Sequence, residues 1–484
     1  MRPVISGVCT SVGVANVVAA DSVEVRRAWV WRRLRALVAH DLLPVARRAG
    51  ARHASDDRIA ARRVDGLKAQ REHGDMRDRE MKRSEWVERY AAEFASIPFV
   101  REFVFPNPQQ VKRDLQKEVC DLLIALRTRA IVVQIKAQER PEDRTGEKLA
   151  AWVRKKANEA VSQLSGSLRT LGTTDVWCDH SRRGRVEFRG GELHREHGIV
   201  LIECGAGTRV ELPAELPLTV RDVPVAYLDA SDFLNVVQQL RSFKEVESYF
   251  AARANLGEDV RRHIGDERIV LEHYLLNGGT FDGWPGYEDA RHLAAADRAA
   301  RDAVFQEKQR QRDIPAGFVE YVADTLAERL PNYAEGLDVA TVQLFDADDQ
   351  RQRYLFMQEV LADVSLVGRR QIGAGLLETF GPAGAEKPPC VYRTFYLDEL
   401  PQFAFVAVST SGVPRQEVVN RTFILLRAAL AHFGWRDGMA IVDRDGASFD
   451  IVLLRGYTPT ETDKAMGRDL FARLRIDDRR DRLV

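Results

Sequence analysis

Three polar residues, Asp121, Gln134 and Lys136, stand within the otherwise apolar stretch that runs from residue 118 to residue 136. A short polar turn at residues 127–129 divides this stretch into two apolar runs, a pattern typical of a β-hairpin. Burying a polar group in a strand is costly unless the group is paired, hydrogen-bonded or bound to a metal. Because side chains alternate along a strand, Gln134 and Lys136 share a face, and a hairpin partner can bring Asp121 alongside them. We therefore expect a carboxylate, an amide and an ammonium group to converge on one spot.

This combination of groups has a definite chemistry. A divalent cation bound by carboxylate and amide oxygens makes a water molecule nucleophilic near neutral pH and stabilises charge on phosphoryl oxygens. A lysine beside the cation adds positive charge where negative charge develops. The residue types are thus a sufficient minimal set for hydrolysis of a phosphodiester bond. The alternative interpretation is that all three are solvated residues at strand ends.

The neighbouring sequence predicts the elements that would position these side chains. Ser84 can cap an amphipathic helix that ends before Pro98, and a second helix is expected over 149–168, after a charged loop. Residues 109–117 are expected to connect a first strand to the hairpin. Strands are expected at 99–105, 186–188, 198–204 and 223–228. A helix broken near residue 242 is expected at 232–254.

The order of helix, three strands, helix and strand, together with Asp121 and the Gln134-Ile135-Lys136 triplet, resembles the PD-(D/E)xK nuclease superfamily. The Gln-x-Lys variant is similar to its Mrr-type, restriction-endonuclease-like branch. The resemblance covers roughly residues 81–228. It implies a restriction-endonuclease-like core, a mixed sheet flanked by helices within an α/β fold, in a nuclease domain at 81–255.

The resemblance also implies roles for individual residues. Asp121 and Gln134 would hold Mg²⁺ or Mn²⁺, and Lys136 would position or activate the attacking water and steady the phosphate. Glu93, on the preceding helix, and Glu118 are further catalytic candidates, although each is also interpretable as an exposed surface charge. Since glutamine brings no charge, either one of these glutamates assists Asp121 or metal affinity is low.

The predicted helix at 149–168 offers candidates for holding a nucleic-acid backbone. Arg154, Lys155 and Lys156 form a basic cluster near its start, and Gln163 lies farther along the same helix. The alternative is that the basic cluster is a solvated face. The histidines at 194 and 197 have a spacing of three residues but no third ligand nearby, so they do not predict a metal site.

The remaining segments carry less information. Residues 1–80 are predicted to be disordered or to reflect a mis-assigned start, and 256–484 to form a second, α+β domain whose sheet comes late and whose function is unknown. The segment 373–389, rich in glycine and proline, is predicted to be an exposed loop, with Gly373 and Gly375 as turn glycines.

The composition of the chain limits the classes of function that are open to it. The 72 basic and 72 acidic residues give zero formal charge, so a nucleic-acid site would have to be local. The five scattered cysteines favour reduced thiols in a cytoplasmic protein, and the apolar runs are too short to span a membrane. We expect a deoxyribonuclease, DNA being a more favoured substrate than RNA, with restriction or antiviral defence as its setting. The alternative is a nuclease-fold nucleic-acid-binding module without catalysis; a homodimer remains open, because many nucleases of this superfamily pair subunits.

Overall fold

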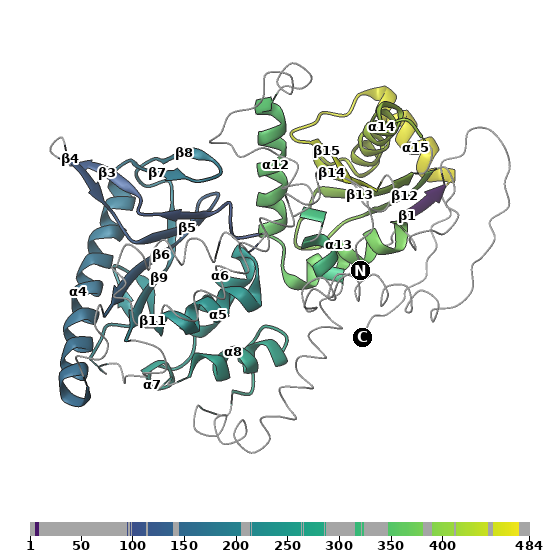
Figure 1. Cartoon of the computed structure of the whole chain (residues 1–484). Helices are drawn as coiled ribbons and strands as arrows, with labels where there is room; N and C mark the ends of the chain where they lie inside the picture. The colour runs from purple at the N-terminus through teal and green to yellow at the C-terminus, as the bar shows by residue number, and fades with distance from the viewer. Residues whose placement is uncertain are drawn as a thin grey trace, which may run out of the picture.

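The computed structural model describes residues 5–8, 94, 97, 99–112, 115–138, 145–204, 213, 215–262, 264, 266–284, 286, 315–320, 322–323, 347–380, 390–410, 413–443 and 449–473. They form a mixed α/β structure in which three sheets are flanked by helices, so the predicted α/β class is confirmed (Figure 1). None of the helices in these ranges is both long and apolar enough to cross a membrane.

The largest sheet has six strands in the order β10-β11-β9-β6-β5-β2. Their bounds are Val104–Pro106 (β2), Leu122–Leu126 (β5), Arg129–Ala137 (β6), His194–Glu203 (β9), Thr219–Val220 (β10) and Val223–Asp229 (β11). β5 and β6 form the predicted antiparallel hairpin, whereas β6, β9 and β11 run parallel. The continuous apolar runs in β6 and β9 fit their central positions, because both faces of a parallel region are covered.

Two helical layers cover this sheet. On one face lies α4 (Gly146–Thr173), which packs on the even-numbered positions of β6. On the other lie α5 (Ala230–Leu240) and α6 (Phe243–Ala254), which pack on the odd-numbered positions. The helix predicted at 149–168 and the break near residue 242 are therefore both confirmed.

A second sheet of four strands, ordered β4-β3-β7-β8, lies beside the first. Its bounds are Gln109–Lys112 (β3), Leu115–Glu118 (β4), Val176–His180 (β7) and Gly184–Phe188 (β8). The prediction that 109–117 merely connects two elements was wrong, because β3 and β4 pair as an antiparallel ribbon. The side chains of β4 are exposed and the described ones of β3 are half-buried or exposed; neither strand shows apolar alternation, so the sequence carries no strand signal there.

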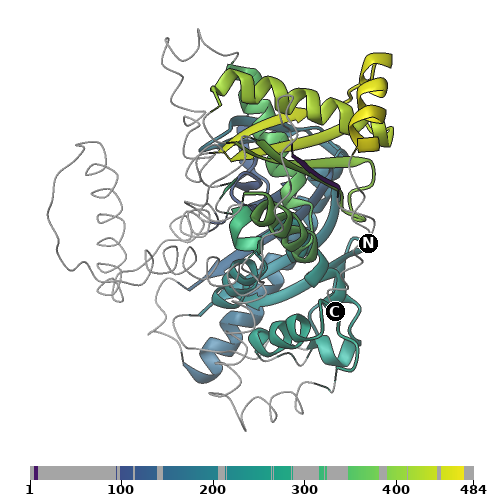
Figure 2. The same cartoon turned by 90° about the vertical axis from the view of Figure 1, so that its right-hand side faces the viewer.

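The C-terminal lobe contains a five-stranded sheet in the order β1-β12-β13-β14-β15. Its bounds are Ile5–Val8 (β1), Cys390–Phe395 (β12), Phe403–Thr410 (β13), Asp437–Asp443 (β14) and Phe449–Leu454 (β15). α14 (Arg415–Phe433) crosses between the parallel strands β13 and β14 and covers one face, whereas α13 (Leu366–Phe380) covers the other (Figure 2). Of the segment 1–80, only Ile5–Val8 is described, as an edge strand on β12, and the rest of that prediction lies outside the described residues.

The loop predicted from residue 373 was wrong for its first part, which belongs to α13. Gly373 is buried, and a Cβ built on it would lie 1.8 Å from the carbonyl oxygen of Pro315. At Gly375 a Cβ would lie 2.8 Å from the Phe395 ring. These glycines therefore allow close helix packing rather than turns.

α12 (Ala347–Ala362) lies between the two lobes in Figure 1. One continuous apolar core extends from beneath α5 and α6 through α12 and α13 to the C-terminal sheet. α7 (Glu258–Arg262) and α8 (Glu267–Leu276) come next in the chain; α8 contacts α5, and its Tyr274 ring lies 5.1 Å from the Tyr249 ring of α6.

Candidate active site

The chain enters the candidate site through a β-bulge. Pro106 pairs with Leu122, and Gln109 pairs with Glu118. Two residues separate Pro106 from Gln109, whereas three separate Glu118 from Leu122, so the segment 118–122 contains one extra residue. Main-chain hydrogen bonds on either side of the interruption place this extra residue at Cys120. Bulges interrupt the alternation of side chains and redirect their neighbours.

The bulge lies directly before Asp121. Val119 and Cys120 are consecutive, yet both pack in the core beneath α4. Asp121 follows on the same face, and only 1% of it is exposed. Its Oδ2 accepts a hydrogen bond of 2.7 Å from the main-chain nitrogen of Ile135 on the neighbouring strand. A buried carboxylate is thus held by a fixed donor, and the prediction that Asp121 lies beside the Gln134-Ile135-Lys136 segment is confirmed.

Gln134 points toward α4 and is 2% exposed. Its Nε2 donates a hydrogen bond of 3.0 Å to Oγ of Ser167, which is also buried. The Ser167 hydroxyl contacts two main-chain carbonyl oxygens, that of Val119 beside the bulge and, at 2.9 Å, that of Gln163 in its own helix. One serine therefore connects the bulge, the helix and the glutamine amide.

Lys136 is 6% exposed, and its Nζ donates a hydrogen bond to Oε1 of Gln163. Gln163 is itself exposed, so this pair lies at the rim of the site. Glu159 lies one helical turn earlier; a hydrogen bond from Lys156 is the main cause that lowers the pKa of its carboxyl, and the charge of Lys136 adds a small contribution. Glu159, Gln163 and Ser167 thus form one stripe of α4 that faces the hairpin.

Sequence reasoning identified Gln163 in this stripe and missed Ser167 and Glu159. The available signal was their spacing of four residues on either side of Gln163, which places all three on one face of a helix.

The two predicted glutamates have different outcomes. Glu118 ends the exposed strand β4, and its charge, with that of Asp121, acts on the Cys120 thiol. Glu93 lies outside the described residues, next to the buried Phe94.

The predicted basic cluster is divided between two flanks of α4. Arg154 forms an exposed ion pair of 3.4 Å with Glu215, on the flank where Ser165 contacts Arg221. Lys156 pairs at 2.7 Å with Glu159 on the flank of the candidate site. Lys155 is exposed.

The cysteines near the site are not nucleophiles. Burial raises the pKa of the Cys120 thiol well above its usual value, and the charges of Asp121 and Glu118 raise it further. Burial likewise raises the pKa of Cys178 and Cys204 to about 12. A thiol that stays protonated is a poor nucleophile and a poor metal ligand.

Asp121 and Gln134 each bring a side-chain oxygen to this site. Across the described ranges, no cluster of three or more His, Cys, Asp or Glu side chains could hold a metal ion. Mg²⁺, however, usually keeps several waters and binds through one or two carboxylates plus substrate phosphates. This donor set fits an ion that completes its coordination with water and phosphate oxygens rather than one held in a protein cage.

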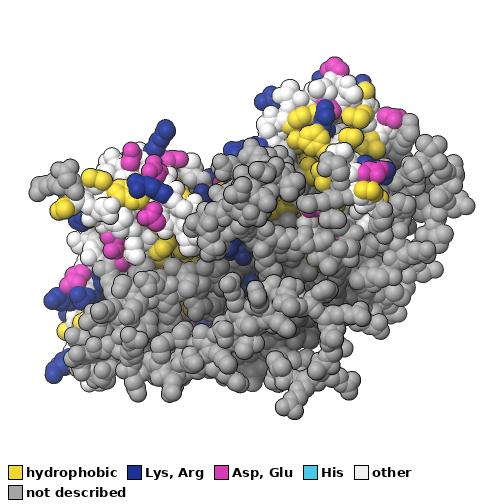
Figure 3. Space-filling model, turned by 45° about the horizontal axis from the view of Figure 1, so that its top comes forward, with side chains coloured by type: hydrophobic (Ala, Val, Ile, Leu, Met, Phe, Trp, Pro, Cys, Tyr) yellow, Lys and Arg dark blue, Asp and Glu magenta, His cyan; other side chains and the backbone are white. Residues whose placement is uncertain are grey.

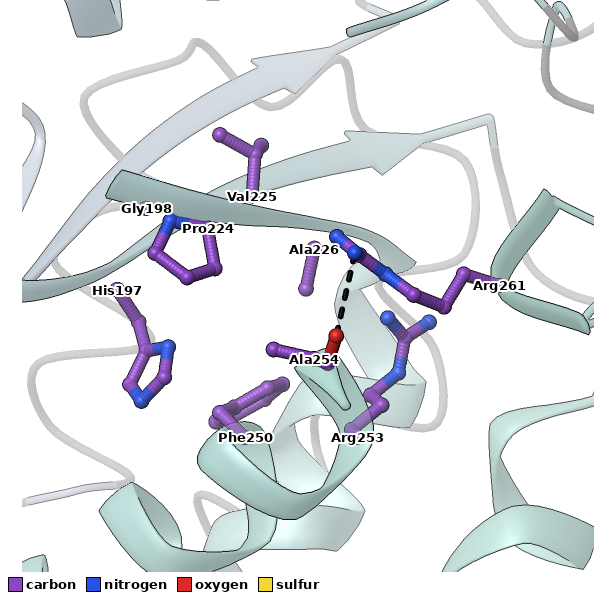
Figure 4. A pocket seen from close by; sticks show the side chains of 9 residues that line it. All are labelled: His197, Gly198, Pro224, Val225, Ala226, Phe250, Arg253, Ala254 and Arg261. Carbon is purple, nitrogen blue, oxygen red and sulfur yellow. Dashed lines mark hydrogen bonds between the residues drawn. The ribbon is translucent and has the colours of Figure 1, made fainter. Parts of the chain in front are cut away.

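A small pocket lies on the opposite side of the sheet (Figure 4). It is lined by His197, Phe250 and Arg261, among others, and Arg261 donates a hydrogen bond of 3.2 Å to the carbonyl of Ala254. Burial lowers the pKa of His197 to about 4, against the opposing effect of a hydrogen bond to the main chain of Glu247. The histidine is therefore neutral at pH 7 and packs as a core residue.

On the described surface in Figure 3, basic and acidic side chains are interspersed over the N-terminal lobe. This agrees with the zero formal charge of the chain. No protein-family model, curated protein or solved structure matches this chain.

Proposed function

We propose that this protein is a divalent-metal-dependent nuclease that hydrolyses phosphodiester bonds, with DNA as its substrate. The observation that carries the proposal is the convergence of Asp121, Gln134 and Lys136 on the sheet face beneath α4, with Gln163 against the lysine. The order β2, β5, β6, α4, β9 supports a restriction-endonuclease-like core, because it follows the strand, strand, strand, helix, strand order implied by the resemblance. The resemblance also supports a role in restriction or antiviral defence.

Each residue has a distinct task in this proposal. Bound Mg²⁺ or Mn²⁺ supplies a coordinated water of lowered pKa and neutralises phosphate charge. Asp121 provides the anionic ligand, and its hydrogen bond to the Ile135 nitrogen keeps it in place. Gln134 provides a neutral oxygen, and Lys136 places an ammonium group at the rim, where the negative charge of a phosphate develops.

Cleavage of supercoiled plasmid with Mg²⁺ or Mn²⁺ tests the proposal. Asp121→Asn keeps an oxygen that can accept from Ile135 but removes the charge, so we expect a folded protein whose cleavage rate falls about 100-fold or more. Lys136→Ala should reduce the rate by about 100-fold. Lys464→Ala, on an exposed helix of the C-terminal lobe, is the matched lysine control and should leave the rate unchanged. Equal cleavage by parent and both site variants would refute the assignment.

A second candidate function is DNA binding without catalysis. The observation that favours it is the donor set, in which only one of the two protein oxygens is anionic. Titration calorimetry separates the two: Mn²⁺ binding that is lost in Asp121→Asn supports the nuclease, whereas DNA affinity with no Mn²⁺ binding supports the binding module.

A further inference from the structure

Ser167 has more hydrogen-bonding partners than protons. Its hydroxyl carries one proton and lies against two carbonyl oxygens, those of Val119 and Gln163, and against the side-chain amide of Gln134. A main-chain carbonyl can only accept, so the proton of Ser167 is directed to the carbonyl side. The group that approaches from Gln134 must therefore be a donor.

This argument fixes the orientation of the Gln134 amide by chemistry, independently of how its nitrogen and oxygen are assigned. The NH₂ group faces Ser167, so the carbonyl oxygen is the atom of the amide that remains for other partners. An ionised glutamate at this position would place an acceptor against Ser167. Either two acceptors would meet, or the hydroxyl would rotate to the carboxylate and give up its carbonyl partner, and both outcomes are costly in a buried site.

We infer that Ser167 is a positioning residue that turns the Gln134 oxygen toward the metal-binding side and makes this position selective for glutamine over glutamate. The metal-binding part of this inference rests on the proposed function; the orientation and the selectivity do not. It accounts for a neutral amide at this position, because the hydroxyl on α4 requires a donor opposite.

A double-mutant cycle tests the inference. Gln134→Glu in the parent background should lower the urea midpoint of unfolding at pH 7. In the Ser167→Ala background the same change should lower the midpoint by clearly less, because the opposing acceptor is gone. Ser162→Ala, an exposed serine of the same helix, is the matched background and should leave the effect of Gln134→Glu unchanged. An equal midpoint shift in all three backgrounds would overturn the inference.

Mn²⁺ calorimetry adds a readout that a merely structural serine would not move. We expect Gln134→Glu to leave Mn²⁺ affinity unimproved in the parent, and to raise it about tenfold in the Ser167→Ala background, where the carboxylate is unopposed. A tenfold gain in the parent background would overturn the positioning role. If neither the parent nor any variant binds Mn²⁺ or cleaves DNA, the proposed function fails, and the cycle in unfolding midpoints still decides the orientation.

Discussion

His197 shows at the scale of one residue how burial controls protonation. Its pKa lies at about 4 in the folded protein and near the ordinary value of about 6.5 in the unfolded chain. As the pH falls below about 6.5 the unfolded state takes up the proton first, so stability that is fully present above this pH is lost down to about pH 4. The loss amounts to about 3 kcal/mol, since each pKa unit corresponds to about 1.4 kcal/mol.

We therefore expect His197→Leu to flatten the pH dependence of the unfolding free energy between pH 6.5 and pH 4.5. Urea denaturation at several pH values measures it, whatever the absolute stability of the variant. His194→Leu, an exposed position on the same strand, is the control and should keep the parental slope. A parental slope in His197→Leu would contradict the expectation.

The candidate site could be predicted in part from the sequence. Alternation along a strand was enough to place Gln134 and Lys136 on one face and to bring Asp121 beside them. The contributions of Ser167 and Glu159 depend on how α4 is rotated about its axis above the sheet. Tertiary packing sets this rotation, so no local pattern encodes it.

At the scale of elements, the N-terminus of α15 (Glu461–Arg473) is tied to α14 by one carboxylate. Asp463 accepts from the main-chain nitrogen of Thr460 at 2.8 Å and from the Tyr457 hydroxyl, and its Oδ1 forms an ion pair of 2.8 Å with Arg427. Thr460 in turn accepts from the Asp463 nitrogen at 3.2 Å, which completes a capping box. Burial acts to raise the pKa of Asp463, but these hydrogen bonds outweigh it and lower the pKa.

We expect Asp463→Asn to cost about 2 kcal/mol of unfolding free energy at pH 7. Because the folded pKa is lowered, the stabilisation by the carboxylate is present above the unfolded pKa of about 3.9 and is lost as the pH falls below it. The difference between variant and parent should therefore shrink in acid, as measured by denaturant titration. Glu461→Gln, an exposed residue of the same turn, should cost little at either pH.

Two helical glycines give opposite expectations for the same substitution. Gly373→Ala should destabilise by about 2 kcal/mol, because its Cβ would collide with the Pro315 carbonyl. Gly166→Ala should stabilise by about 0.5–1 kcal/mol, because a Cβ there meets nothing within 4 Å and alanine favours the helix. Thermal unfolding of the two variants measures both signs, and a shift in the same direction would refute the packing argument.

Elements with strong periodicity were predictable, whereas the ribbon β3–β4 was not. Long helices such as α4 and α14 are recognisable in the sequence from the helical spacing of the apolar residues on their buried face. The ribbon has no buried apolar face that would mark its strands in the sequence. The pairing of β3 with β4 follows from the pairing of the adjoining strands β2 and β5.

At the scale of the whole molecule, ion pairs link the two lobes at the C-terminal end of α12, where Asp363 directly follows the helix. Asp363 accepts from Arg127 at 2.8 Å and also from Arg129, which bonds Glu247 at 2.5 Å as well. Earlier in α12, the Tyr354 hydroxyl donates a hydrogen bond of 3.1 Å to the fully buried Glu102. The C-terminal lobe thus meets the hairpin at its turn, at the end opposite to Lys136.

We expect Asp363→Ala to lower the unfolding free energy by about 2 kcal/mol, because Arg129 and Arg127 lose a partly buried partner. The rate of DNA cleavage per folded molecule should stay at the parental value, since the turn is remote from the candidate site. Denaturant titration and plasmid cleavage on the same preparation measure the two quantities. Loss of cleavage by fully folded Asp363→Ala would show that the lobes communicate with the site.

The bulge at Cys120 separates a segment whose geometry is fixed by strand pairing, at Asp121, from the strand β4, whose exposed side chains can be substituted. On its C-terminal side, β5 and β6 fix Asp121 through their own pairing. On the other side, all four side chains of β4 are exposed. Because the extra residue absorbs any mismatch of register between the two sheets, β4 tolerates substitution without moving the carboxylate. For protein engineering, β4 is therefore the strand where side chains can be exchanged while the geometry around Asp121 stays intact.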